Sequence, residues 1–236
     1  MIKLTNWKID YQKQLLNFSN EPLAPNSTES LYTTKFKTEL LSGVPTIDLI
    51  IDGIVIKNVI VDVGYNGGII IPNKYADKFS EKESVNIVDQ STSGIFGSTR
   101  DELEIKELEI DLGGNAANVP IEFTSQNKAL IGNDFLEHFT LYLNYQDQTI
   151  TFEQTSRIEI DPPKPFIPGI LNDSLWIVDR VNSTIPLSIG DTLVSINGLK
   201  PAEVYSSNCD YFLNLSGLIG DSILVETTSN AHIRIK

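Results

Sequence analysis

The feature that most constrains this chain is a series of short β-branched runs separated by turn residues. Two of them, Thr46–Ile51 and Ile54–Val61, flank the pair Asp52–Gly53. An Asp-Gly pair between such runs is a strong hairpin signal, because a type I′ turn needs positive φ at both central residues. Similar runs occur at Ile69–Ile71, Leu103–Ile105, Leu108–Leu112, Val119–Phe123, Leu141–Tyr145 and Thr149–Phe152. The pattern predicts a mainly antiparallel β domain.

Helix is expected in few places. Asn73–Phe79 and Asn133–Phe139 are the best helical candidates. Acidic and apolar residues alternate from Leu103 to Leu112 apart from one slip at Lys106–Glu107, which predicts a half-buried strand pair or a β-bulge.

A proline-rich stretch divides the chain. Prolines 162, 163 and 165 fix backbone angles and remove amide donors, so this stretch cannot continue a β-ladder. Hydrophobic patterning resumes beyond it, with expected strands at Leu175–Val181, Thr192–Ile196, Ile223–Thr227 and His232–Ile235 and an amphipathic run at Glu203–Leu215. With 236 residues, two modest domains are expected. The predicted organisation is an N-terminal hairpin and connector over 1–34, a β lobe over 35–158, a linker over 159–165 and a small α+β domain over 166–236.

Composition excludes some classes of function. The net charge of −13 and the lack of a basic run argue against nucleic-acid binding, which needs clustered Lys and Arg. Cys209 is the single cysteine, and His138 and His232 are isolated, so no zinc spacing exists and no metal or cofactor is expected. No apolar run approaches the ~20 residues of a membrane-spanning helix. The first residues also lack the apolar core of an export signal.

An internal similarity links the start of the chain to the end of the β lobe. Tyr11–Phe18 reads YQKQLLNF, and Tyr145–Phe152 reads YQDQTITF. Both segments resemble a β-hairpin with a polar turn. Because the second copy closes the β lobe, the first is interpreted as the closing hairpin of an earlier, similar lobe, with chance similarity between short hairpins as the alternative.

The strongest candidate for chemistry is Asp62, which ends the apolar run Val59–Val61 just before Gly64. An isolated Asp-x-Gly is usually only a turn that ends a strand. Two further segments change this interpretation, namely Ala129–Leu136, which reads ALIGNDFL, and Ser93–Gly97, which reads SGIFG.

Together these three segments resemble the retropepsin-like aspartic peptidases over about residues 35 to 155. The resemblance implies an acid-protease β-barrel lobe with Asp62 as catalytic residue and Val63, Gly64 and Tyr65 as its active-site loop. It also implies a segment crossing behind this loop, Leu130–Ile131–Gly132, and a mobile flap at Gly94, Ile95, Phe96 and Gly97. Such a site needs two carboxylates that share a proton, so Asp62 requires a second lobe, either from a homodimer or from upstream.

Two positions depart from the family pattern. Val63 stands where family members carry Thr or Ser, whose hydroxyl ties the two active-site loops together, and Tyr65 stands where Ala is usual. Asp134 is interpreted as a helix cap and His138 as a packed or surface residue. Two alternatives to an aspartic endopeptidase therefore stay open: an inactive peptide-binding or scaffold protein, and a regulatory lobe of a larger two-lobed enzyme.

The C-terminal segment Leu187–Gly198, which reads LSIGDTLVSING, resembles PDZ domains. Such domains bind an extended peptide as an added strand. The resemblance implies a carboxylate-binding turn at Pro168, Gly169 and Ile170, with a fold used only for packing as the alternative. The expected partner of the whole chain is a polypeptide substrate or ligand. Relatives of this kind imply an extracytoplasmic location, which would require a leader upstream of Met1.

Overall fold

The computed structural model describes residues 5–25, 31–39, 42–90, 93–94, 97–98, 100–113, 115–172, 174–205, 218–220, 222–229 and 231–235. They form two compact units, Met1–Glu83 with Lys106–Pro162, and Ser84–Ile105 with Pro163–Lys236. The chain passes between units within the proline-rich stretch, while residues 84–105, expected in the β lobe, group with the C-terminal unit. The fold is mainly β, as expected. Within the described residues, no helix has the length and apolar character needed to cross a membrane.

The first unit contains the strands β1 (Asn6–Asp10), β2 (Leu15–Ser19), β3 (Leu31–Lys35), β4 (Lys37–Thr38), β5 (Pro45–Ile51), β6 (Ile54–Val61), β7 (Ile69–Pro72), β12 (Asn115–Thr124), β13 (Leu130–Ile131), β14 (Phe139–Asn144) and β15 (Thr149–Gln154). It also contains most of β11 (Asp101–Leu112), the 3-10 helix η2 (Asn73–Phe79) and the short helix α1 (Asn133–Leu136).

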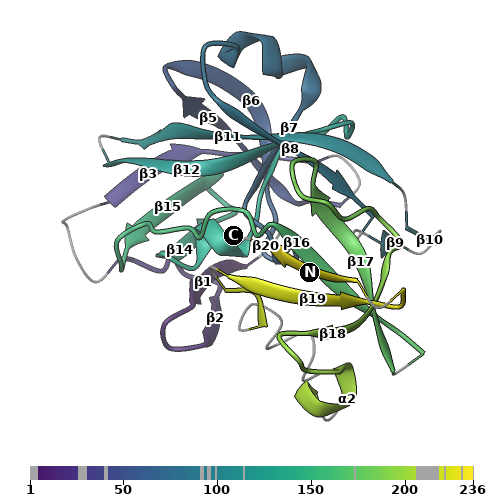
Figure 1. Cartoon of the computed structure of the whole chain (residues 1–236). Coiled ribbons are helices and arrows are strands. Elements are labelled where there is room, and N and C mark those ends of the chain that lie inside the picture. The colour runs from purple at the N-terminus through teal and green to yellow at the C-terminus, as the bar shows by residue number, and fades with distance from the viewer. Residues whose placement is uncertain are drawn as a thin grey trace. The chain divides into compact units, whose positions relative to one another are not determined.

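Six strands of this unit close into a barrel (Figure 1). The hydrogen-bonded order is β5-β6-β13-β7-β12-β11, and β11 pairs back onto β5 through Ile110 opposite Ile51. The β5–β6 hairpin turns at Asp52 and Gly53, whose φ values of 44° and 74° match the predicted turn. Buried side chains from every barrel strand form one core, which includes Leu49, Ile56, Ile69, Leu108, Ile121 and Ile131.

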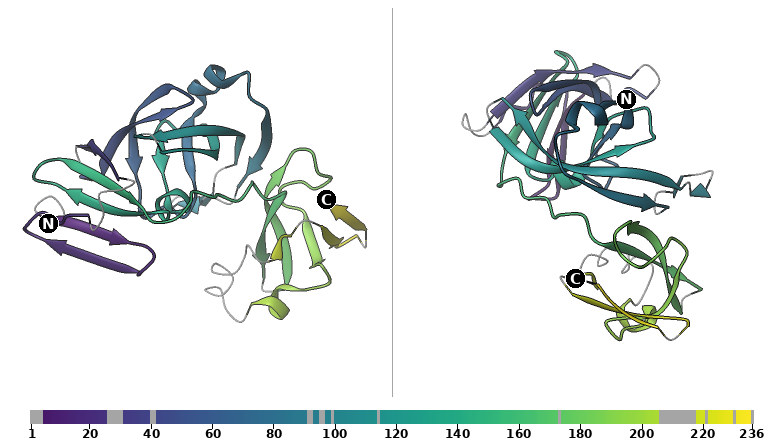
Figure 2. Two further views of the ribbon diagram at one scale, coloured as in Figure 1. Left: turned by 90° about the vertical axis from the view of Figure 1, so that its left-hand side faces the viewer. Right: turned by 45° about the horizontal axis from the view of Figure 1, so that its top comes forward.

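A second sheet of the first unit has the strand order β2-β1-β14-β15-β3. The N-terminal β1–β2 hairpin forms one end of this sheet (Figure 2). Phe152 and Ile150 on β15 are 1% and 0% exposed and belong to the barrel core. The sheet therefore closes one side of the lobe.

The second unit contains the strands β8 (Ser84–Asp89), β9 (Ser93–Gly94), β10 (Gly97–Ser98), β16 (Phe166–Leu171), β17 (Leu175–Asn182), β18 (Thr192–Ile196), β19 (Ile223–Thr227) and β20 (His232–Ile235), with the helix α2 (Pro201–Val204). Strands β16, β17, β18, β19 and β20 pair in sequence order, all antiparallel. Trp176 is fully buried at the centre of their core. Strand β8 also pairs with β17.

Several local expectations are corrected. Of the two alternatives for the slip at Lys106–Glu107, the strand pair is wrong, because residues 101–112 form one continuous strand. At the slip, the consecutive residues Ile105 and Lys106 are both buried. The buried Lys106 ammonium donates a hydrogen bond to the backbone oxygen of Phe79 at 3.0 Å, which offsets part of the cost of its burial. Helix α1 stops at Leu136, shorter than expected. Most of the amphipathic run, residues 206–215, lies outside the described residues.

Candidate active site

Asp62 follows directly after β6, at the start of the loop that leads to β7. Its backbone N–H donates to the oxygen of Ile131 at 2.9 Å, which continues the ladder between β6 and β13 for one residue. Its side chain accepts the backbone N–H of Gly64 at 2.9 Å. The carboxylate is thus held over a tight turn by its own backbone, as short acidic side chains commonly are.

The strand β13 lies between β6 and β7. Leu130 and Ile131 pair in parallel with Ile60 and Val61, and in antiparallel fashion with β7. A chain that inserts between two consecutive strands ties both ends of their connecting loop to one rigid element. The loop from Asp62 to Gly68 is therefore fixed from behind by Leu130–Gly132.

The residues after β13 hold this loop by backbone bonds. Gly132 N–H donates to Gly68 O at 2.8 Å, Asn133 N–H to Tyr65 O at 2.8 Å, and Asp134 N–H to Gly67 O at 3.2 Å. These amides belong to the beginning of α1, where helical donors have no partner within the helix. The loop carbonyls satisfy them.

Position 132 requires glycine because the backbone of the Asp62 loop approaches it closely. A Cβ at this position would lie 2.3 Å from Gly67 O and 2.8 Å from Tyr65 O. Both neighbours are backbone atoms of the Asp62 loop, so they cannot rotate away. Glycine is therefore needed at position 132 because of this close contact with the loop, and not because of its own φ.

The side chain of Asn133 ties the loop together, a role that the sequence did not reveal. Its Nδ2 donates to Val63 O at 3.2 Å and to Asn66 Oδ1 at 3.1 Å. Its Oδ1 accepts a 2.8 Å bond from the hydroxyl of Tyr11 on the N-terminal hairpin. Burial, followed by the charge of Glu137, raises the pKa of Tyr11 to about 12, so this donor keeps its proton at neutral pH.

The two departures from the family pattern have different surroundings. Val63 is 48% exposed, so its side chain is presented outward from the loop. Tyr65 is partly buried, and its ring lies against Gly67 and Gly132, where an added Cβ would meet it. The glycines on either side make room for this large residue.

Asp134 is not the expected helix cap. Residue Gly132 occupies the cap position of α1, with no side-chain cap bond. Asp134 is exposed, but partial desolvation raises the pKa of its carboxyl, and the nearby charges of Glu137, Glu122 and Asp161 raise it further, against a smaller lowering effect of His138. His138 was expected to be either packed or on the surface, and it is buried. Its Nδ1 lies 2.9 Å from Ser156 Oγ.

The remaining predicted site residues belong to the second unit. Gly94 pairs with Gly97 across a short hairpin, while Ile95 and Phe96 lie outside the described residues. Pro168, Gly169 and Ile170 lie within strand β16 rather than in a turn. The pairing with β17 shifts between Ile167 and Pro168, an irregularity that accommodates a proline without an amide donor.

Among the described residues, no cluster of three or more His, Cys, Asp or Glu side chains is arranged to hold a metal ion. No family model matches the chain, and no curated protein matches it. Among solved structures, the chain is similar to the EIAV protease in complex with the inhibitor HBY-793, with 18% sequence identity and a TM-score of 0.32. The match covers 43% of this chain and 92% of that chain.

Proposed function

We propose that the first unit is one lobe of an aspartic endopeptidase, with Asp62 as one of its two catalytic carboxylates. The observation that carries this proposal is the insertion of β13 between β6 and β7, which fixes a carboxylate-bearing loop from behind. A bare strand-ending turn would need no such support.

The proposed reaction uses Asp62 together with a carboxylate from another lobe. Two carboxylates in close contact cannot both ionise, so the pair shares one proton and titrates as a unit. The ionised member takes a proton from water, which attacks the peptide carbonyl, and the protonated member donates to the carbonyl oxygen. The C–N bond then breaks as the proton taken from water passes to the leaving amine and the other carboxylate recovers its proton from the hydroxyl. The backbone N–H of Gly64, 2.9 Å from the Asp62 carboxylate, would hold the carboxylate in position.

The test is cleavage of an unfolded protein substrate between pH 3 and 7, using the protein expressed from its complete gene. Asp62→Asn is expected to abolish cleavage, because an amide cannot take a proton from water. Asp77→Asn makes the same change at an exposed position of the same lobe and is expected to leave cleavage unchanged. Equal activity of Asp62→Asn and wild type would refute the proposal.

A second candidate function is peptide binding without catalysis. The observation in its favour is Val63, a 48% exposed apolar side chain next to Asp62. A valine at this position has no hydroxyl with which to tie the loop to a second lobe. Peptide binding by wild type without cleavage at any pH in this range would favour this function.

For the second unit we propose a peptide-recruiting role. The segment Leu187–Gly198, which resembles PDZ domains, supports this role, because such domains bind an extended peptide as an added strand. Strand β16 is proposed as the strand beside which the peptide adds. Slower amide exchange of Ile170 and Leu171 when a peptide is added would support this role, and unchanged exchange at saturating peptide would argue for a packing role.

A further inference from the structure

A cavity of about 430 Å³ lies in the first unit. Its wall is formed by β4, β5, β6 and β7, by the beginning of η2 and by the residues that precede β13. No residue of the Asp62–Gly68 loop lines it. Sites for small molecules have volumes of roughly 300–1,000 Å³, so this cavity is large enough to hold a compact ligand.

The lining of the cavity is positively charged, although the chain as a whole is acidic. Four lysines line it, namely Lys37, Lys57, Lys74 and Lys128, and Glu39 is the one acidic residue among the described residues that do so. The whole chain contains 31 acidic and 18 basic residues, with a net charge of −13. The local charge is therefore opposite in sign to the net charge. A cleft lined by one sign of charge concentrates ligands of the other sign.

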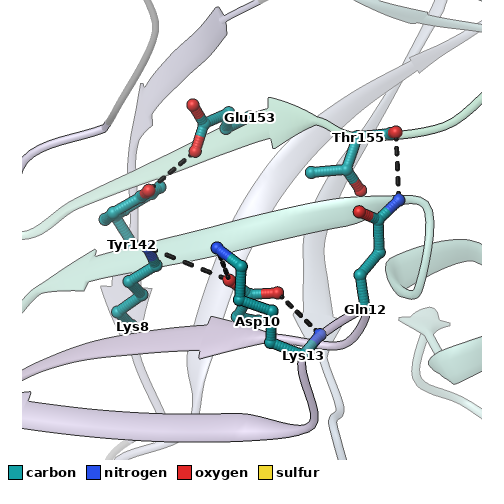
Figure 3. Close-up of polar contacts among 7 residues, drawn as sticks. All are labelled: Lys8, Asp10, Gln12, Lys13, Tyr142, Glu153 and Thr155. Atoms are coloured by element: carbon teal, nitrogen blue, oxygen red, sulfur yellow. Dashed lines mark hydrogen bonds and ion pairs between the residues drawn. The ribbon is translucent and has the colours of Figure 1, made fainter.

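The cavity lysines lack the acidic partners that lysines have elsewhere in this unit. The Lys13 ammonium, for example, lies 3.4 Å from Asp10 Oδ2 (Figure 3). Within the described part of the chain, Lys37, Lys57 and Lys74 form no ion pair. Like charges that line one cavity repel one another, and a bound anion would offset this repulsion.

Glu39 neutralises Lys128 and leaves the other three lysines uncompensated. Its Oε1 lies 2.6 Å from Lys128 Nζ, and its Oε2 accepts the Ser42 hydroxyl at 3.1 Å. The hydrogen bonds from Lys128 and Ser42 lower the pKa of Glu39, so this carboxylate is ionised at neutral pH. Since both of its oxygens already accept a bond, Glu39 is committed to this corner of the cavity.

A β-bulge in β6 builds part of the wall. The pairing with β5 shifts between Ile47 and Leu49. As a result, Lys57 and Asn58 together lie opposite Asp48. Asn58 has a φ of 56°, in the left-handed region that asparagine tolerates, and its N–H donates to Asp48 Oδ1 at 3.0 Å. Both bulge residues line the cavity, and bulges commonly re-aim side chains beside functional sites.

The helix η2 brings a second group of cations to the cavity. Its Lys74 and Tyr75 belong to the lining. The ammonium groups of Lys74 and Lys78 lie 5.3 Å and 5.4 Å from the centre of the Tyr75 ring. An aromatic ring attracts cations but carries no net charge, so it holds both ammonium groups in place without neutralising them.

The polar groups of the lining are mainly hydrogen-bond donors. Besides the lysines, Asn58 and Asn127 contribute side-chain amides, and Tyr75 contributes a hydroxyl. A ligand that complements this lining is rich in acceptor oxygens and negative charge, which are the properties of phosphate and carboxylate groups.

We propose that this cavity binds a small molecule with two or more phosphate or carboxylate groups, which Lys37, Lys57 and Lys74 hold. The concave shape and the limited volume favour a small molecule over an acidic protein segment. This site goes beyond the proposed function, because no step of peptide hydrolysis uses it.

The test is isothermal titration calorimetry of the whole chain with pyrophosphate and with citrate, at low ionic strength, where charges are least screened. Saturable binding of either anion at one site is expected. Binding of pyrophosphate alone would assign a phosphorylated ligand, and binding of citrate would extend the class to polycarboxylates. The absence of saturable binding for both anions would overturn the proposal. Tighter binding of a tetraglutamate peptide than of either anion would also overturn it, in favour of an acidic protein segment.

Variants assign the binding to the cavity. Lys57→Gln and Lys74→Gln are each expected to weaken binding about tenfold, because each removes a charge-assisted hydrogen bond. Lys13→Gln removes the same charge outside the cavity and is expected to leave the affinity unchanged.

Glu39→Gln is expected to tighten binding, because it removes the acidic charge of the lining and releases Lys128. A variant that failed to fold could not produce this gain. Equal affinities of wild type, Lys57→Gln and Glu39→Gln would overturn the proposal. The readout does not depend on catalysis, so an inactive Asp62 site would leave it unchanged.

Discussion

The hydroxyl of Tyr11 donates a 2.8 Å hydrogen bond to Asn133, a residue 122 positions later in the chain. Asn133 in turn binds Val63 and Asn66 in the loop that carries Asp62. The N-terminal hairpin thereby supports the candidate catalytic loop through one side chain.

Tyr11→Phe is expected to loosen this loop while the fold persists. The substitution removes a single hydrogen bond, which contributes about 0.5–1.5 kcal/mol to stability. Faster amide exchange at Gly64 and Tyr65 would check the effect. Tyr32→Phe is the matched control, since among the described residues the Tyr32 ring packs on Phe152 without a hydroxyl bond. An unchanged exchange rate in Tyr11→Phe would show that the backbone bonds alone fix the loop.

Gly132→Ala is expected to displace the Asp62 loop. The added methyl group would lie 2.3 Å from Gly67 O, and overpacking of this kind costs about 1–3 kcal/mol or more. The control is Gly68→Ala in the same loop, where the nearest neighbour of the added Cβ, Pro120 O, is 4.0 Å away. Thermal unfolding measures the difference. Equal melting temperatures for the two variants would mean that the close approach at Gly132 is easily relaxed.

The sequence predicted the fold where local chemistry decides it. The Asp52–Gly53 turn appeared where expected, because a type I′ turn selects few residue types. The strands Thr192–Ile196, Ile223–Thr227 and His232–Ile235 have the predicted bounds. The resemblance to PDZ domains implied a turn at Pro168–Ile170, but these residues lie in strand β16, where the register shift that accommodates the proline depends on the partner strand.

The candidate site was only partly accessible from the sequence. Asp62, Leu130 and Gly132 belong to recognisable motifs, and the structure brings them together. The bond between Tyr11 and Asn133 joins distant residues and has no local signature. Asp134 was expected to cap α1, but Gly132 occupies the cap position, and the loop carbonyls already accept the free amides.

Asp134→Asn is expected to stabilise the protein near neutral pH. Partial desolvation of the exposed Asp134 and neighbouring carboxylates raise its pKa, so the folded protein binds this proton more tightly than the unfolded chain does. The stabilising effect of protonation is present below the ordinary value of 3.8 and is lost as the pH rises through the raised pKa. The asparagine variant should therefore melt at a higher temperature than wild type at pH 7, with the gain disappearing below pH 3.8. Asp77→Asn controls for net charge, and a gain that does not change with pH would contradict this explanation.

Arg180 and Asp89 join β17 to β8 through a largely buried ion pair, with Nη1 2.9 Å from Oδ2 and side-chain exposures of 12% and 6%. Arg180→Met would leave Asp89 buried next to Asp179, whose pKa is already raised by burial and by Asp89. Breaking one side of a buried pair costs about 3–5 kcal/mol, so the second unit should unfold at clearly lower urea concentration. The exposed pair Arg157–Glu159 provides the comparison, because Arg157→Met should cost about 0–1 kcal/mol. A double variant Asp89→Asn with Arg180→Met should recover part of the loss, since the buried carboxylate that lost its ion pair with Arg180 is then replaced by an amide. If the double variant were as unstable as Arg180→Met alone, the loss would come from packing of the arginine stem and not from the lost ion pair of Asp89.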